Sequence, residues 1–565
     1  MTSGFECDII KQNYDGNYNI LEEFILTNIK ITKLEYAHIF GGAGFHNNDA
    51  TMYHIIDDEH FNQYICKCYR ETSPGFMRTF AGFSDWTKEA MDEFADYYEK
   101  MQKWTDTPMY LTPGMGKNHF SDEALQKYCE DVAENLDYLY NVKNVKHIRY
   151  YCFSNELSCN MYGVLVNDLP LFQKYQEGLF VAFQKRNLPI GLLATDASEY
   201  EHWDTVDYAI KNMPSITEDF CVHIYEREHD IYNLEFYDFF AEKCKAIVDK
   251  SVLCFGKRVI LGEIGIQKNA GQLSFNKGIV IDTNRYFADE HEQAYCGLML
   301  TEMAFAAINS GIFALAYWSY VDHPDPYSCA YSSGDDEYAK KWGEAERFFS
   351  TTADSKYNKW GFLKWDDEKA DYKARYHYWC IGLLTKFFKR NSKVLDIACS
   401  DKKLRACGIF NRDKTVTVGI VNRNKVATEI SLDTSLFGSD IRVYEYDANN
   451  PPYNEFADLQ DYTAIINKDK PIYILKPESV TYFTTDYILK EESVYAEGVE
   501  ADNGLIKWDA VEDKNHCYYR VFTSNEQDFI PSVENQIAST VATSIKNEKP
   551  LKYIKVISID KSGNM

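Results

Sequence analysis

Two apolar runs decide the fold of this 565-residue chain: HIRYYCFSNEL (residues 147–157) and KRVILGEIG (residues 257–265). Each run is typical of a β-strand and closes on a glutamate, Glu156 in the first and Glu263 in the second. In a barrel of parallel strands joined by helices, the C-terminal ends of the strands carry the catalytic groups. An isolated glutamate after a strand can also be an ordinary loop carboxylate, so it is the pair that indicates a site.

The sequence around these runs repeats the same pattern. Short apolar runs alternate with amphipathic segments between residues 33 and 365, which is typical of βα units. We expect eight strands, at residues 36–44, 75–82, 109–114, 147–155, 190–196, 220–225, 259–263 and 312–319. Helices are expected between them, with apolar residues three and four positions apart, as at 86–104, 122–141 and 169–187. This order predicts an α/β fold, a (β/α)8 or TIM barrel at residues 33–372.

Two further regions are rich in short β-runs. A helix at 376–390 leads into runs separated by turn residues, which predicts an antiparallel β-sandwich at residues 373–488. Residues 1–32 form an N-terminal segment that we expect to add a strand to this sandwich. The pattern restarts near Val494, which predicts a small C-terminal β-sandwich at residues 489–565.

The charge and the apolar segments limit the partners. The formal net charge is −26, which argues against a nucleic-acid partner because phosphate binding depends on clustered Lys and Arg. A neutral sugar substrate is compatible with this charge. The most apolar stretch, residues 297–318, is interrupted by Glu302 and by Asn309-Ser310-Gly311. We interpret it as a helix, a turn and a strand, and we expect no membrane partner.

The cysteines and the N-terminus bear on the location. Fifteen cysteines occur without a CxxC pair. The first residues lack the basic segment and the following apolar segment that are typical of a signal peptide. An odd number of cysteines without a leader favours reduced thiols, so we predict a cytoplasmic protein. We attribute the close spacing of Cys66 and Cys68 to alternation on a strand.

Several polar and aromatic residues close other predicted strands. His223 and Tyr225 lie two positions apart, so their side chains share one face of the sixth strand. Arg78 lies in the second strand and Trp318 ends the eighth. Weaker candidates for the cleft are His46 in the loop after the first strand, His119 after the third and Asp196 at the end of the fifth. Each of these residues also has a plainer interpretation. Arg78 can form a salt bridge that lines the barrel, and the others can be core or ordinary loop residues.

Ser-Asn-Glu at 154–156 and Gly-Glu-Ile-Gly at 262–265 resemble the ends of strands 4 and 7 in clan A glycoside hydrolases. The resemblance implies retaining hydrolysis, with Glu156 as acid/base and Glu263 as nucleophile. It also implies that Asn155 binds the sugar 2-hydroxyl and that Tyr225, on the same face as His223, donates to the nucleophile. The clan tends to carry an arginine at the position of Arg78. At the position of Trp318 it commonly has an aromatic residue that forms the floor of the −1 sugar subsite.

The resemblance has limits along the chain. The order of barrel, helix and sandwich is nearest to families 39, 30 and 51, but Leu157 follows Glu156 where the clan commonly has proline. Residues 494–565 resemble a fibronectin type III module, with Trp508 in the second strand and Tyr518-Tyr519-Arg520-Val521 in the third. We expect Trp508 to be a core residue, and we expect the module to carry no chemistry.

Three functions remain open. The first is a retaining, exo-acting glycosidase for β-linked or arabinofuranosyl glycosides. The second is an endo-acting glycanase with an open groove, and the third is a carbohydrate-binding or scaffold protein without turnover. The sequence shows no HExxH, Walker, GxSxG or zinc-spaced motif, so we expect no cofactor and no metal. The expected partner is a carbohydrate substrate, with homo-oligomer formation open.

Overall fold

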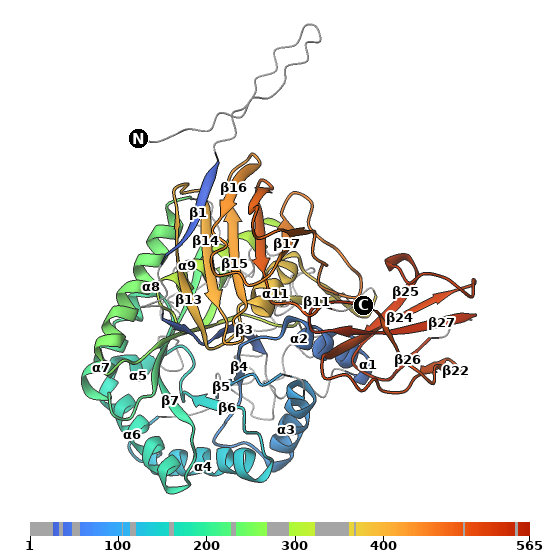
Figure 1. The fold of residues 1–565 in the computed structure, drawn as a ribbon. Coiled ribbons are helices and arrows are strands. Elements are labelled where there is room, and N and C mark those ends of the chain that lie inside the picture. The colour runs from blue at the N-terminus through green and yellow to red at the C-terminus, as the bar shows by residue number, and fades with distance from the viewer. Residues whose placement is uncertain are drawn as a thin grey trace, which may run out of the picture.

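The computed structural model describes twelve segments of the chain (Figure 1). They are residues 26–32, 38–47, 57–103, 105–113, 120–157, 163–227, 233–267, 293–322, 361–366, 369–489, 492–547 and 552–565. Figure 1 shows the β-sandwich region above the barrel and the C-terminal region, in red, beside it.

Eight parallel strands close into a barrel in the order β10-β3-β4-β5-β6-β7-β8-β9. The strands are β3 (Gly42–Asn47), β4 (Phe76–Phe80), β5 (Met109–Thr112), β6 (Ile148–Tyr151), β7 (Gly191–Ala197), β8 (Asp219–Arg227), β9 (Val259–Gln267) and β10 (Ala314–Tyr317). This confirms the predicted TIM barrel. The strands are mostly apolar on both faces because one face packs inside the barrel, around Phe76, Tyr110 and Ile260, and the other packs on the helices.

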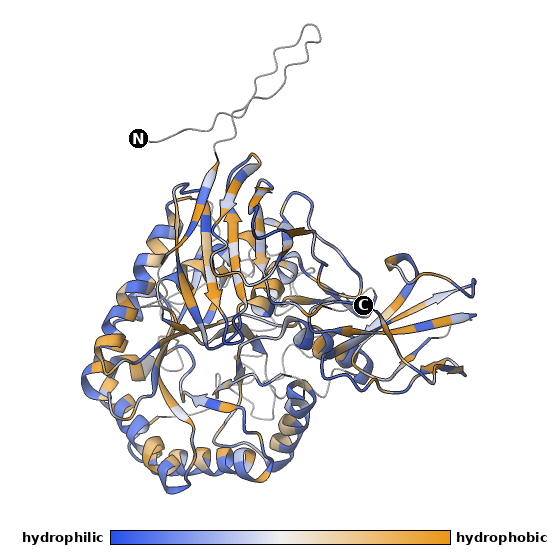
Figure 2. Ribbon diagram, viewed as in Figure 1, coloured by the Kyte–Doolittle hydropathy of each residue, from blue (hydrophilic) through white to orange (hydrophobic). Residues whose placement is uncertain are grey.

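The helices expected at residues 86–104, 122–141 and 169–187 are present, and further helices lie between the other strands. They are α1 (Asp58–His60), η3 (Phe61–Ile65), α2 (Cys66–Thr72), α3 (Lys88–Gln102), α4 (Leu125–Asp137), η4 (Tyr138–Val142), α5 (Gly163–Asn167), α6 (Leu169–Lys185), η5 (Tyr200–His202), α7 (Thr205–Asn212), α8 (Phe236–Leu253) and α9 (Tyr295–Asn309). The outer helices carry both hydrophobic and hydrophilic residues (Figure 2), as expected when one face packs on the strands and the other faces water.

Two local predictions are wrong. The apolar run expected to form one strand at 36–44 is divided, because β2 (Ile39–Phe40) pairs with the sandwich strand β13 (Ser392–Cys399) and only β3 enters the barrel. Gly42, with φ +127°, allows this change of direction. Cys66 and Cys68 lie on helix α2, not on a strand, and both are buried.

Helix α9 joins the barrel to the sandwich. It is the helix predicted in the apolar stretch before the last barrel strand, and it is buried on all sides from Cys296 to Ile308. Glu302 in this helix pairs with Arg405 at 3.3 Å and with Arg423, both from the sandwich. Separating the barrel from the sandwich would leave these buried charges without partners, which is strongly unfavourable. The contacts therefore hold the two regions together.

The sandwich region is a ten-stranded sheet, mostly antiparallel, with helix α11 (Tyr376–Phe387) between it and the barrel. Its other strands are β1 (Thr27–Thr32), β14 (Leu404–Phe410), β15 (Val416–Asn422), β16 (Thr428–Leu432), β17 (Ile441–Asp447), β18 (Ala464–Ile466), β19 (Ile472–Leu475) and β20 (Ser479–Thr484). Strand β1 pairs with β13 and β16. A short hairpin, β11 (Leu363–Asp366) and β12 (Asp371–Ala374), precedes α11.

The C-terminal region consists of a four-stranded and a three-stranded antiparallel sheet. The four-stranded sheet contains β21 (Val494–Tyr495), β24 (His516–Ser524), β25 (Gln536–Thr540) and β27 (Tyr553–Asp560). The three-stranded sheet contains β22 (Glu500–Asp502), β23 (Leu505–Lys507) and β26 (Ser544–Lys546). A short helix, η11 (Val533–Asn535), precedes β25. Trp508 is buried among Ile506, Tyr519 and Val521, as predicted for a core residue. The specific likeness to fibronectin type III stays a prediction.

Within the described part of the chain, no helix is both long and apolar enough to cross a membrane. The 12 cysteines described there are all free thiols. The cytoplasmic location stays a prediction.

Candidate active site

Every strand of the barrel contributes a side chain to one cluster. The residues are His46 from β3, Arg78 from β4, Tyr110 from β5, Asn155 and Glu156 after β6, Asp196 from β7, His223 and Tyr225 from β8, Glu263 from β9 and Trp318 after β10. Because the strands are parallel, residues near their carboxyl ends meet at one end of the barrel. The cluster is therefore assembled from segments up to 272 positions apart in sequence (His46 to Trp318).

Glu263 is the more buried of the two glutamates, with 4% of its surface exposed. Its Oε1 accepts a hydrogen bond from the Arg78 guanidinium, and its Oε2 accepts one from the Tyr225 hydroxyl. Burial raises the pKa of Glu263, while Arg78, His223 and the Tyr225 hydroxyl oppose that rise because they favour the ionised form. Glu263 is thus a fixed carboxylate whose ionisation depends on its hydrogen-bond donors.

Glu156 lies in the segment that follows β6, five residues beyond the strand end at Tyr151. Its backbone has φ +52°, an uncommon value for a residue other than glycine. Its side chain is 24% exposed, against 5% for Glu263. One carboxylate oxygen of Glu156 lies within 4.8 Å of one of Glu263. The structure therefore brings together the two glutamates that the sequence pairs, in different environments.

Arg78 is the centre of the hydrogen-bond network. It is fully buried and donates to Glu263, to the amide oxygen of Asn155, to Asp196 Oδ2 at 2.9 Å and to His46 Nδ1 at 2.8 Å. Burial lowers the pKa of Arg78, but the carboxylates of Asp196 and Glu263 outweigh it and raise this pKa well above its ordinary value. A guanidinium has several donors in a fixed plane, so one side chain can orient all of these groups.

His223 and Asp196 form a buried pair behind the glutamates. His223 Nε2 lies 2.8 Å from Asp196 Oδ1, and its Nδ1 lies 3.4 Å from Glu156 Oε1 and 3.8 Å from Glu263 Oε2. Burial lowers the pKa of His223, but Asp196 and Glu263 outweigh it and raise this pKa to about 9. Burial raises the pKa of Asp196, but His223 and Arg78 outweigh it and lower this pKa. The imidazolium is thus a fixed positive charge facing both glutamates.

Aromatic rings form one wall of the cluster. The ring of His46 lies 4.4 Å from that of Trp318 and 4.5 Å from that of Phe80, between centroids. Trp318 is partly exposed, whereas His46 is fully buried. Burial and the neighbouring Arg78 lower the pKa of His46 well below its ordinary value, so this ring is neutral. A partly exposed indole face beside two carboxylates suits the apolar face of a sugar ring.

The structure refines several of the predicted positions. His46 lies within strand β3 and is buried, rather than in the following loop, and Asp196 is buried behind the glutamates rather than facing an open cleft. His119 lies outside the described residues. Two contributors had no sequence signal: the Tyr110 hydroxyl donates to Asp196 Oδ1 at 2.7 Å, and Cys221 Sγ lies 2.9 Å from the same oxygen. Both are common strand residues, and only the barrel brings them to Asp196.

Two sets of side chains have donor atoms close enough to suggest a metal: Asp196, Cys221 and His223, and Glu156, His223 and Glu263. Both sets depend on His223, whose raised pKa keeps both ring nitrogens protonated near neutral pH. Arg78, which is bonded to Asp196 and Glu263, would also lie beside any cation. The donor sets therefore fit an ion-pair network better than a metal centre.

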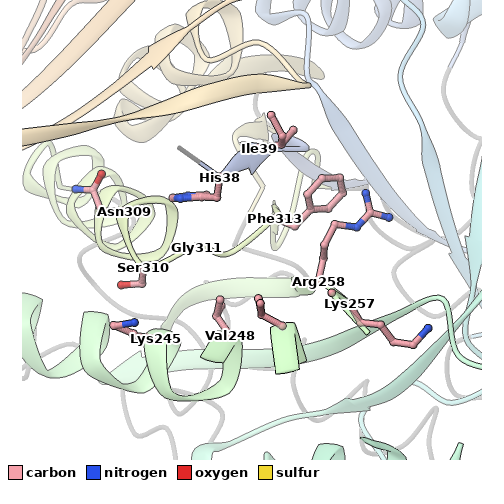
Figure 3. Close-up of a pocket in the computed structure, with 12 residues that line it drawn as sticks. His38, Ile39, Lys245, Val248, Lys257, Arg258, Asn309, Ser310, Gly311 and Phe313 are labelled. Carbon is pink, nitrogen blue, oxygen red and sulfur yellow. The ribbon is translucent and has the colours of Figure 1, made fainter. Parts of the chain in front are cut away.

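A pocket of about 450 Å³ lies at the opposite end of the barrel (Figure 3). It is lined by Lys257 and Arg258 before β9, by Phe313 before β10 and by Ile39 before β3, hence at the amino ends of these strands. Arg258 is already paired with Asp219 and stacks on Phe313 at 4.0 Å. The paired charges at this end of the barrel contribute to stability, and neither glutamate lines the pocket.

The sequence matches no model of a known protein family, and no relative is found among curated proteins. Solved structures share the fold, including the catalytic domain of GH30 xylanase C from Talaromyces cellulolyticus, with a TM-score of 0.52 and 11% identity over 81% of this chain and 99% of that one. The GH51 arabinofuranosidase from Xanthomonas axonopodis pv. citri has a TM-score of 0.53 and 12% identity over 81% and 99%. An endo-β-1,6-glucanase has a TM-score of 0.51 and 11% identity over 81% and 94%.

At such low identity, these comparisons show the fold alone. They confirm the predicted resemblance to clan A glycosidases at that level, because GH30 and GH51 structures share the closed parallel barrel with additional antiparallel sheets. The three named proteins act on different glycosides, so a shared fold leaves the substrate of this chain open.

Proposed function

We propose that this protein is a retaining glycoside hydrolase in which Glu263 is the nucleophile and Glu156 the acid/base. The observation that carries the proposal is that one carboxylate oxygen of Glu156 lies within 4.8 Å of one of Glu263, at the carboxyl ends of the barrel strands. Retaining enzymes hold their two carboxyl groups about 5–5.5 Å apart, whereas inverting enzymes need about 6.5–9.5 Å to admit a water. The short separation favours direct attack by one of the carboxylates.

The two environments support the assignment of roles. A nucleophile has to be ionised and fixed, and Glu263 is held by Arg78 and Tyr225. An acid/base has to exchange protons with the leaving group and with water, and Glu156 is the more exposed residue. Glu263 attacks the anomeric carbon while Glu156 protonates the leaving oxygen, and Glu156 then removes a proton from the water that hydrolyses the glycosyl-enzyme.

The neighbouring residues have supporting roles in this proposal. Because Arg78 fixes the amide oxygen of Asn155, the amide nitrogen of Asn155 is left to donate to the sugar 2-hydroxyl. His223, held by Asp196, balances the negative charge of the Glu263 carboxylate. Trp318 offers the ring on which the −1 sugar stacks. Three points stay predictions: action at chain ends, a substrate range of β-linked or arabinofuranosyl glycosides, and homo-oligomer formation.

A panel of aryl glycosides tests the function. We expect hydrolysis of at least one nitrophenyl β-glucoside, β-xyloside, β-galactoside or α-L-arabinofuranoside, with the first sugar product in the configuration of the substrate. Proton NMR of the early product distinguishes this result from inversion. Binding of sugars without hydrolysis of any panel member would instead support the non-catalytic alternative.

A second prediction concerns pH. The Tyr225 hydroxyl favours ionised Glu263, so Tyr225→Phe should raise the Glu263 pKa, and the acid limb of kcat/KM should move to higher pH. A hydrogen bond to a charged group is worth about 1.5–3 kcal/mol, which corresponds to a shift of about one to two pH units. Tyr110→Phe is the matched control, because that hydroxyl donates to Asp196. An acid limb that moves equally in both variants would argue against Glu263 as the ionising group.

A further inference from the structure

The C-terminal region has a strand that is buried on both faces. Tyr519 and Val521 of β24 face the core around Trp508, between the two sheets of this region. Tyr518 and Arg520 alternate with them and point to the other face, yet they are only 0% and 8% exposed. In a free-standing sandwich the outer face of an antiparallel sheet is solvated and polar. Something else therefore covers this face of β24.

Helix α2 of the barrel covers part of it. The Tyr518 hydroxyl donates to Glu71 Oε1 at 2.9 Å, and Lys67 Nζ lies 4.8 Å from the centre of the Tyr518 ring. Lys67 and Glu71, one turn apart on α2, pair with each other at 2.8 Å. The helical segment also bonds to the region through its backbone, since the amide of Val541 donates to the carbonyl of Asn62 at 3.2 Å.

The sandwich region supplies the third part through the loop that contains Asp458. Asp458 Oδ1 lies 2.6 Å from Lys67 Nζ, and its Oδ2 lies 2.9 Å from Arg520 Nε. Gln536 and Ser539, both from β25, donate to the same Oδ2 at 2.8 and 3.0 Å. Asp458 thus pairs with one cation from the barrel and one from the C-terminal region.

Four buried charges pair at this junction. Lys67 pairs with Glu71 and with Asp458, and Arg520 pairs with Asp458. Taking charges out of water is unfavourable unless each one is paired, and removal of one partner leaves an uncompensated charge. These pairs are drawn from three regions of the chain, so the set is complete only when all three are assembled.

We propose that residues 492–565 are an obligate intramolecular clamp, which joins the barrel to the sandwich through Tyr518 and Arg520, and not a detachable accessory module. The segment that it holds, from α1 to α2, connects strands β3 and β4, which carry His46 and Arg78. The proposal is independent of the proposed function, because it depends only on the packing of this junction.

Cleavage of the folded full-length chain tests the proposal. Leu489, before the C-terminal region, is 82% exposed, so a protease recognition sequence inserted after it should be cleavable in the native protein. We expect the two pieces to remain together in size-exclusion chromatography at micromolar concentration and to unfold in one calorimetric transition. Separate elution of a folded C-terminal piece, or a separate melting transition for it, would overturn the proposal.

Substitutions in the same cleavable chain test the charges. Arg520→Met leaves Asp458 without one of its two cations and should weaken association of the cleaved pieces by about 30-fold or more, the cost of truncating a buried charge pair. Tyr518→Phe removes one hydroxyl and should weaken it by a smaller factor. Lys507→Met, on the exposed side of β23, is the control and should leave association unchanged. Equal affinities for all three variants would contradict the role of the buried charges.

Discussion

Glu263→Ala should reduce kcat by about 10⁵-fold or more, which corresponds to about 7 kcal/mol of lost transition-state stabilisation. The loss is this large because the glycosyl-enzyme cannot form without the nucleophilic carboxylate. The truncated side chain leaves space beside Arg78 and Tyr225, and azide should enter it and attack the anomeric carbon of an activated aryl glycoside. One displacement inverts the centre, so NMR should identify a glycosyl azide of inverted configuration.

Glu263→Gln is the matched control for this rescue. It also removes the negative charge, but its amide fills the space that azide would occupy, so azide should restore little activity. The stereochemistry also checks the assignment of roles. A glycosyl azide of retained configuration from Glu263→Ala would mean that Glu263 is the acid/base and that Glu156 is the nucleophile.

The barrel strands were predictable because each is a short apolar run bounded by turn residues. The run expected at 220–225, for example, corresponds to β8 at Asp219–Arg227. The first strand shows what such a pattern lacks. Phe40 and Ala43 both lie in the run expected at 36–44, but Phe40 pairs with a sandwich strand and Ala43 with a barrel strand. Hydrophobicity predicts that a segment is buried, and it does not indicate which sheet the segment joins.

The site was predictable where a residue type and a strand end coincide. Glu156 and Glu263 follow apolar runs and are brought within 4.8 Å of each other. Asp196 and His223 were predicted as candidate site residues, but their contacts were not. Tyr110 and His223 reach the Asp196 carboxylate from two other strands of the barrel. Their interaction depends on the closure of the barrel, and no local pattern encodes it.

The C-terminal region illustrates the same limit. The sequence predicted Trp508 as a core residue, which the structure confirms. The alternation in Tyr518-Tyr519-Arg520-Val521 predicts one buried and one solvated face, and an arginine is usually on the solvated one. Here Arg520 is buried because Asp458, from the sandwich region, lies opposite to it. A charge can be recognised as buried only when its partner is known.

Glu156→Ala should affect substrates according to their leaving groups. Without the acid, kcat/KM for a glycoside with an alkyl or unactivated phenyl leaving group should fall by about 10³-fold, within the usual range for general acid catalysis. A dinitrophenyl glycoside releases dinitrophenolate, which needs no proton to leave. For this substrate kcat/KM should stay within about 10-fold of the wild type. Its kcat should fall nonetheless, because Glu156 is also the base for the hydrolysis of the glycosyl-enzyme, and a burst of dinitrophenol should precede slow turnover.

The leaving-group series separates this role from a structural one. Damage to the fold would lower kcat/KM for both kinds of substrate by the same factor, whereas loss of the acid gives a slope against leaving-group pKa that is steeper than in the wild type. Azide should accelerate turnover of the dinitrophenyl substrate by attacking the glycosyl-enzyme, and the product should be a glycosyl azide of retained configuration. This is the opposite stereochemistry to that expected for Glu263→Ala, so the two variants together assign both carboxylates. A flat leaving-group dependence in Glu156→Ala would show that another group protonates the leaving oxygen.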